Sequence, residues 1–378
     1  MFQKIKALER LGNYAIIVVE MNIADKVFNG MNGIVDEIKG MGRTYALLRE
    51  LSSINGANIS GKLLDKAMYS FEALPPLGKE YWWFLFFGRD GRQMMLLVFR
   101  KFGRSMVFNG KEVVFKKMNR NAFQAVTAGW VYNKRRIRDL GCSNSVIVVN
   151  LEEKTMVSKV SNREMTLKGG FPEYELTIEG LVRMKMTEGD FLESRGARGV
   201  FIPPFGAGWV DIYSNAEGDV LGERFEGTAH LQKVIGIMPY GSFYWARVVF
   251  QNGSVTSFFC LKTGKSSKRY FHRSMNFYDH ENQRYIRFIR PRLMLSGERG
   301  KIQTWTVEGW DKDNELRMVL EVYAEKRFTM KGGGSQVYVE YAVRPREFSF
   351  RTKDQKITLQ DLGEGVGTFE DAYGSLVF

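Results

Sequence analysis

The sequence predicts a mainly β protein, with two antiparallel β-barrels in tandem behind an N-terminal helical segment. Three observations predict this fold class. Aromatic residues make up 13% of the 378 residues and glycine occurs 39 times, which is typical of antiparallel sheet joined by tight turns. Dipeptides of the hairpin type, such as Asp90-Gly91 and Asn252-Gly253, separate pairs of strand-like runs. Beyond residue 80, candidate strands recur roughly every 8–14 residues without long helical patterns between them.

The first 75 residues have a different pattern. Apolar residues recur there at helical spacing, beginning with Phe2, Ile5, Leu8 and Leu11. We therefore expect short amphipathic helices over 1–75 that end at Pro75-Pro76 and dock on the β body as a cap. The alternative is a membrane-surface or dimer helix, because Lys4, Lys6 and Arg10 accompany the apolar residues.

Two β regions follow the helical segment. The first covers residues 76–203 and the second covers 204–378, with the boundary placed at Pro203-Pro204. Each region has its own hairpins, with a turn also expected at Glu217-Gly218. No sequence repeat relates the two regions, so the expectation of two similar barrels rests on architecture.

Composition and motif spacing exclude several classes of protein. The longest apolar stretch near the N-terminus covers 14–19, far short of the roughly 20 residues in a membrane-spanning helix. Two cysteines cannot build a disulfide framework, and three histidines without a Cys-x-x-Cys motif predict no metal site. The glycines at 363, 365 and 367 lack dinucleotide-motif spacing, and no P-loop occurs, so we expect no cofactor. The prediction is a cytoplasmic protein.

The chain is basic, with 55 Lys and Arg against 42 Asp and Glu and a formal net charge of +13. Such a charge attracts nucleic acid or an anionic membrane surface. Arg287, Arg290 and Arg292 fall on one predicted strand whose alternate positions are apolar, which is typical of the solvated face of a half-buried strand. Nucleic-acid binding is therefore not favoured, whereas an anionic membrane surface stays a candidate partner.

Polar residues embedded in aromatic strands are the candidates for chemistry. Glu80 precedes Tyr81-Trp82-Trp83, and Glu340 lies between aromatic residues of a later strand. Alternate side chains of a strand share a face, so Glu226, His230 and Gln232 should lie together. Carboxylates and an imidazole in an apolar cup can perform acid–base chemistry on an apolar ligand. The alternative for each residue is a structural polar group, exposed or satisfied within the core.

Several of these segments resemble the motifs of one known family. They are Glu80-Tyr81-Trp82-Trp83-Phe84, the stretch from Gly227 through His230 and Gln232, the Trp245 strand with its Asn252-Gly253 turn, Tyr338-Val339-Glu340-Tyr341, and Gly365-Val366-Gly367-Thr368-Phe369-Glu370. Over residues 80–378 the sequence resembles the AttH-like and carotenoid 1,2-hydratase superfamily. The resemblance implies two lipocalin-like barrels in tandem and an apolar ligand. The acidic residue that the hydratase pattern places before its central histidine is Ala229 here.

We therefore expect the chain to bind an elongated isoprenoid- or lipid-like molecule in a barrel or in the cleft between the barrels. The ligand-binding candidates are Glu80, Trp82, Trp83, Glu226, His230, Gln232, Trp245, Glu340 and Tyr341. One alternative is a lyase or isomerase acting on such a ligand, with His230 and Glu226 as acid–base candidates. Another is a basic protein that binds nucleic acid or a membrane surface. The sequence leaves the oligomeric state open.

Overall fold

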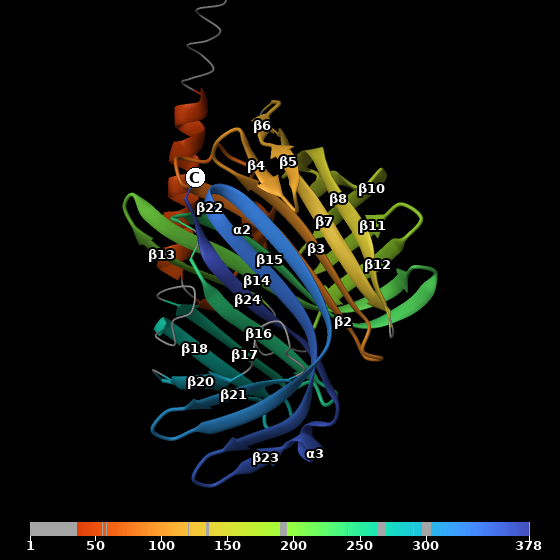
Figure 1. Cartoon of the computed structure of the whole chain (residues 1–378), viewed down its shortest axis with the longest axis vertical. Coiled ribbons are helices and arrows are strands. Elements are labelled where there is room, and N and C mark those ends of the chain that lie inside the picture. Colours follow the sequence, from red (N-terminus) through yellow and green to blue (C-terminus); the bar gives the residue numbers. More distant parts are fainter. Residues whose placement is uncertain are drawn as a thin grey trace, which may run out of the picture.

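The computed structural model describes residues 36–377, apart from 55, 58, 120, 134–135, 190–194, 240, 263–269, 290 and 297–303. It is mainly β, as the sequence predicted, and consists of two lipocalin-like β units in succession (Figure 1). The predicted helices before residue 36 and the basic residue Arg290 lie outside the described residues. None of the helices within the described ranges has the length and hydropathy required to cross a bilayer.

The first unit, called here the first barrel, is a closed ring of ten antiparallel strands. Its ladder closes because β15 pairs with β2 on one side and with β14 on the other. In ladder order the ring contains β2 (Gly78–Gly88), β3 (Gln93–Lys101), β7 (Ala122–Asn133), β8 (Arg136–Asn150), β9 (Thr155–Val160), β10 (Arg163–Gly170), β11 (Glu173–Ile178), β12 (Val182–Glu188), β14 (Phe205–Val220) and β15 (Glu223–Ile237). Outside the ring, β13 (Arg195–Ile202) extends the ladder from β14, β1 (Gly56–Ala57) pairs with β13, and β6 (Lys116–Lys117) pairs with β7.

The second unit, called the second sheet, curls around a core of its own. Its main ladder runs from β19 to β20 and consists of β16 (Phe243–Phe250), β17 (Val255–Lys262), β18 (Tyr270–Asp279), β19 (Arg284–Arg287), β20 (Arg292–Ser296), β21 (Thr304–Trp310), the long bent β22 (Glu315–Arg351) and β24 (Gly365–Val377). Three short strands and a helix join it, namely β4 (Ser105–Phe108), β5 (Lys111–Val114), β23 (Lys356–Thr358) and α3 (Leu359–Leu362).

Sheet membership differs from the predicted division of the chain. Apart from β4 and β5, which join the second sheet, it changes between Ile237, the last residue of β15, and Phe243, the first residue of β16, and not at residue 203. Pro203-Pro204 form the turn of the β13–β14 hairpin, whose two strands stay in register on either side of it. Two further expectations also differ. β14 runs straight through Glu217-Gly218, and Arg287 and Arg292 lie on separate strands, β19 and β20.

Helix occupies the described part of the N-terminal segment. One helix covers 36–54, and α2 (Gly61–Tyr69) begins at Ser60, whose side chain accepts a hydrogen bond from the Leu63 backbone N–H. Apolar residues of both helices belong to the core of the first barrel. The Trp82 indole N–H inside the barrel donates to the Met68 carbonyl at 2.9 Å, which fixes α2 in that core.

A third core joins the two units. Along β2, Trp82 and Phe84 point into the first barrel, whereas Trp83 and Leu85 point outward, because successive side chains of a strand face opposite sides. The outward residues pack with Val249 and other residues of the second sheet. β2 is therefore buried on both faces, which explains its unbroken aromatic and apolar run from Tyr81 to Phe87.

Candidate functional site

The candidate site lies where the outer face of the first barrel meets the second sheet. In Figure 1, β22 and β24 cross over β14 and β15 in this region. His230 on β15 is 1% exposed and stacks on Trp245 of β16, with 5.6 Å between ring centroids. The polar face of β15 thus points out of the first barrel and into the space between the two units.

His230 forms a hydrogen-bonded group with two neighbours. Its Nε2 lies 2.9 Å from Asp211 Oδ1 on β14, and Gln232 Nε2 donates to the same oxygen at 2.7 Å. Burial would raise the pKa of Asp211, but the hydrogen bonds from His230 and Gln232 hold that pKa below its usual value. Burial lowers the pKa of His230, and the bond to Asp211 opposes this only in part. At neutral pH the imidazole is therefore neutral, Nε2 donates to Asp211, and Nδ1 presents a lone pair.

Two buried carboxyl groups face each other on the second sheet. Glu340 of β22 and Glu370 of β24 are cross-strand partners, 0% and 6% exposed. Burial raises the pKa of Glu340 to about 8, against the hydroxyls of Thr368 and Tyr338. Burial and the neighbouring Glu340 raise the pKa of Glu370 well above its usual value. Because two adjacent carboxylates cannot both ionise readily, this pair retains at least one proton at neutral pH.

A closed series of contacts joins the two groups, and we call its members the contact ring. Trp245 is the cross-strand partner of Glu370, and Tyr338 shares the face of Glu340 two residues along β22. Tyr338 packs against Trp83 at 5.2 Å between centroids, and Trp83 is the cross-strand partner of Gln232. The contact ring is Asp211, His230, Trp245, Glu370, Glu340, Tyr338, Trp83 and Gln232.

Cationic side chains adjoin the contact ring on the His230 side. The Arg247 guanidinium lies 3.7 Å from the centroid of the Tyr213 ring, and Tyr213 in turn lies 4.6 Å from His230 between centroids. Arg198 of β13 interacts with Tyr285 of β19 and with Asp211. Arg198 favours the ionised state of Asp211, and Arg247 opposes protonation of His230.

Buried polar atoms without a hydrogen-bond partner concentrate on the facing surfaces of the two units. Of the nine such atoms in the described residues, six are Trp83 Nε1, Trp130 Nε1, Thr228 Oγ1, His230 Nδ1, Gln336 Oε1 and Glu340 Oε2, and the remaining three are Ser214 Oγ, Asn276 Oδ1 and Trp305 Nε1. A buried polar atom without a partner costs about 1–3 kcal/mol, so folded proteins rarely keep several together. Three of these atoms belong to the contact ring, where a bound molecule could supply their partners.

The structure brings together five of the predicted site residues and separates the other four. Trp83, His230, Gln232, Trp245 and Glu340 are members of the contact ring. Glu80 and Trp82 lie inside the first barrel, where Glu80 pairs with Arg100 at 2.5 Å and with Lys233 at 2.8 Å. Glu226 shares the strand face of His230 but is exposed and pairs with Arg89. Tyr341 belongs to the core of the second sheet.

Sequence reasoning missed Asp211, Tyr338 and Glu370 as site residues. Tyr338 and Glu370 lie within the segments that carry the family resemblance, so their motifs contained the signal. The position of Asp211 beside Gln232 depends on the register between β14 and β15. The β14–β15 turn is at Leu221-Gly222, where both residues have positive φ, and this turn sets Asp211 opposite Gln232. A turn at Glu217-Gly218 would give a different partner.

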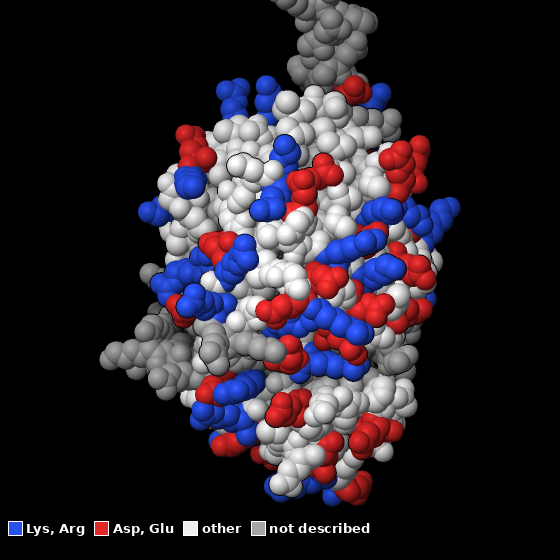
Figure 2. Space-filling model, turned by 90° about the vertical axis from the view of Figure 1, so that its right-hand side faces the viewer, with Lys and Arg blue, Asp and Glu red and all other residues white. Residues whose placement is uncertain are grey.

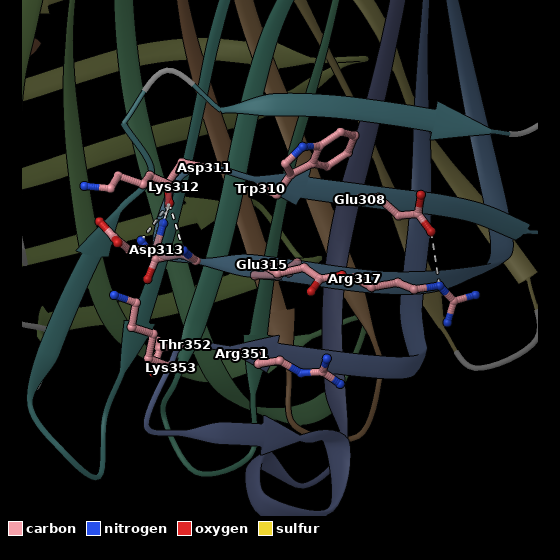
Figure 3. Close-up of a pocket in the computed structure, with 12 residues that line it drawn as sticks. Glu308, Trp310, Asp311, Lys312, Asp313, Glu315, Arg317, Arg351, Thr352 and Lys353 are labelled. Atoms are coloured by element: carbon pink, nitrogen blue, oxygen red, sulfur yellow. Dashed lines mark hydrogen bonds and ion pairs between the residues drawn. The ribbon is translucent and has the colours of Figure 1, made fainter.

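A separate surface pocket lies at the end of the second sheet (Figure 3). It has a volume of about 580 Å³ and is lined by the β21–β22 turn around Asp311 and by Trp310, Arg351 and Lys353. Its lining is mostly charged, with Glu308 and Arg317 forming an ion pair at 3.3 Å. None of the predicted site residues lines this pocket. Among the described residues, no three His, Cys, Asp or Glu side chains are grouped to hold a metal ion.

Comparison with known proteins gives structural resemblances at low identity. No protein-family model and no curated protein matches the chain. A protein of Nitrosomonas europaea assigned as an AttH is 10% identical with a TM-score of 0.41, covering 78% of this chain and 92% of its own. CghA with Sch210972 is 10% identical at a TM-score of 0.49, covering 86% and 95%. Kievitone hydratase from Nectria haematococca is 9% identical at 0.40, covering 85% and 97%. The AttH is of the kind that the sequence motifs predicted.

Proposed function

We propose that the chain binds an elongated apolar small molecule between its two β units, at the contact ring. The observation that carries this proposal is the set of buried polar atoms without partners at His230, Glu340 and Trp83. Ligand sites are mostly apolar with a few convergent polar groups, and the contact ring has this composition. Trp83, Trp245 and Tyr338 supply aromatic walls, and the polar atoms of His230 and Glu340 fix the orientation of the ligand.

The interior of the first barrel is a less suitable place for the ligand. Apolar side chains of the barrel and of α2 form one packed core there. The Lys233 ammonium inside the barrel bonds Glu80 at 2.8 Å and lies 4.4 Å from the Trp82 ring. These polar groups already have partners, so binding a ligand would break bonds without satisfying new ones.

Acid–base catalysis on the bound molecule is the second candidate function. A protonated Glu340–Glu370 pair can donate a proton, and neutral His230, oriented by Asp211, can accept one. Groups whose pKa values are displaced in opposite directions within one site are the usual signature of such chemistry. The reaction class supported by this arrangement is that of an isomerase or lyase which protonates an apolar substrate and removes a proton elsewhere.

The test is solvent extraction of the purified protein, with mass spectrometry of the extract. The His230→Ala variant should lose ligand by about tenfold to a hundredfold per mole of folded protein, since one lost partner in an apolar site costs about 1–3 kcal/mol. His272→Ala is the control, because His272 is exposed on β18. Retention unchanged in His230→Ala, with only a lower melting temperature, would assign His230 a structural role and overturn the proposal.

A further inference from the structure

The tip of the β13–β14 hairpin is an exposed apolar surface. Residues 199–206 read Gly-Val-Phe-Ile-Pro-Pro-Phe-Gly and contain no polar side chain. Ile202 is 69% exposed, Val200 57% and Phe205 46%, and both prolines are exposed. β13 lies outside the closed ladder, and the hairpin projects at the left of Figure 1 beside the helix over 36–54. Contiguous exposed apolar residues at a projecting tip are typical of an interaction surface.

One face of this hairpin leads from the tip to the contact ring. Residues paired in antiparallel register share a face, which places Ile202 with Phe205, Val200 with Ala207, and then Trp209 with Val234. The next pair along this face is Asp211 with Gln232 of the contact ring. Exposure falls along the same path, from 69% at Ile202 through half-buried Trp209 and Val234 to 8% at Asp211. One charged side chain of β13, Arg198, also lies on this face, opposite Trp209. The other residues named form what we call the apolar track, which begins in solvent and ends at the candidate site.

Basic side chains lie beside the hairpin. Arg198 of β13 interacts with Tyr285, so β19 of the second sheet adjoins the hairpin. On β19, Arg287 shares the strand face of Tyr285 and is exposed, and Arg292 of β20 is exposed as well. The connection between β19 and β20 also exposes Ile289 at 75%. An apolar element flanked by arginines combines the two signals that hold a protein on an anionic bilayer.

The side of the molecule opposite the hairpin does not combine exposed apolar residues with unopposed basic residues in this way. Figure 2 shows basic and acidic residues interleaved there. The ladder explains the pattern, since Lys168 pairs with Glu175, Glu175 with Lys185, and Lys185 with Glu217 across neighbouring strands. Opposite charges thus neutralise one another on this face, and the attraction of an anionic surface belongs to the hairpin side.

We propose that the tip of the β13–β14 hairpin inserts into the surface of an anionic lipid bilayer. The apolar track then takes a ligand from the bilayer to the contact ring, a part that rests on the proposed function above. Membrane docking itself requires only the tip and the adjacent arginines.

Vesicle co-sedimentation of the full-length protein tests the docking surface. The vesicles contain phosphatidylcholine alone or phosphatidylcholine with about one-third phosphatidylserine, and the wild type should bind the second kind more tightly. Replacing Ile202 and Phe205 together by serine should weaken binding at least about tenfold, because two inserted apolar side chains are lost. Both residues are exposed, so the circular dichroism and melting temperature of this variant should match the wild type.

The matched control replaces Val146 and Val148 on β8, exposed at 42% and 44%, by serine. This control should bind vesicles as the wild type does. Equal binding by the Ile202→Ser/Phe205→Ser variant would overturn the proposal. A second result would also overturn it: the wild type does not bind vesicles but forms a dimer in sedimentation velocity, and the Ile202→Ser/Phe205→Ser variant does not form that dimer. His230→Ala should keep vesicle binding, so failure of the proposed function and failure of membrane docking give different results.

Discussion

At the residue scale, the Glu340–Glu370 pair is the least expected feature of the molecule. Two carboxyl groups directly opposite one another in a sheet repel when both are ionised. The pair is tolerated because it holds a proton at neutral pH, which burial favours. A buried proton donor thus lies beside the aromatic side chains of Trp245 and Tyr338. The proton that it keeps should affect the pH dependence of the free energy of unfolding.

The Glu340→Gln variant tests this through the pH dependence of unfolding. Burial raises the pKa of Glu340 from 4.5 to about 8, so the folded protein keeps a proton that the unfolded chain has lost. The contribution of Glu340 to wild-type stability should therefore be fully present below pH 4.5 and be lost as the pH rises to about 8. The variant should lack much of this decrease and exceed the wild type at pH 8 by an amount on the order of 2 kcal/mol.

Chemical denaturation at a series of pH values measures this difference. Glu112→Gln is the control, because Glu112 is exposed on β5. Its stability should follow the wild type at every pH. Parallel curves for wild type and Glu340→Gln would mean that Glu340 is ionised in the folded protein, and the acid role assigned to it would fail.

At the element scale, the alternation of side chains between the two faces of a strand made some site residues predictable but not others. The period of two correctly grouped Glu226, His230 and Gln232 on one face of β15. The period of two does not show which face of a strand points into the barrel. Because β2 is apolar on both faces around its tryptophans, Trp82 and Trp83 could not be assigned to different cores. Asp211 required the register of β14 with β15, and the sequence analysis placed that turn wrongly at Glu217-Gly218.

The two glutamates that fall outside the contact ring should differ sharply in their effect on stability. Glu80→Gln leaves the buried Arg100 and Lys233 side chains without their anion, and should cost about 3–5 kcal/mol. Glu226→Gln removes only an exposed pair with Arg89, and should cost less than about 1 kcal/mol. Urea unfolding of both variants measures the difference. A Glu80→Gln protein as stable as Glu226→Gln would contradict the assignment of Glu80 to a structural ion cluster.

At the scale of the whole molecule, the two β units share a core, so neither is independent of the other. Gln93 of β3 donates from its Nε2 to the Gly367 carbonyl of β24 at 2.6 Å, and β4 of the first half pairs with β22 of the second sheet. This interpenetration explains why the sequence predicted two consecutive β units but not where one ends. Hairpin signals are local, whereas pairing between β4 and β22 joins residues far apart in the chain.

The shared core also fixes the walls of the candidate site. Trp83 comes from the first barrel, and Trp245 and Tyr338 come from the second sheet. The contact ring therefore exists only when both units are docked, and a ligand held there contacts both. The surface pocket around Trp310 belongs to the second sheet alone. It is therefore the alternative ligand site against which the contact ring can be tested.

Binding of cis-parinaric acid, an elongated polyene whose own fluorescence reports its environment, tests the central claim most directly. Titrations compare the wild type with Trp83→Leu, Trp245→Leu and Trp310→Leu, each checked for folding by its melting temperature. We predict about tenfold or greater loss of affinity for Trp83→Leu and Trp245→Leu, and wild-type affinity for Trp310→Leu. Loss of binding in Trp310→Leu, with Trp83→Leu and Trp245→Leu unaffected, would place the ligand in the pocket of Figure 3 and contradict a site between the two β units.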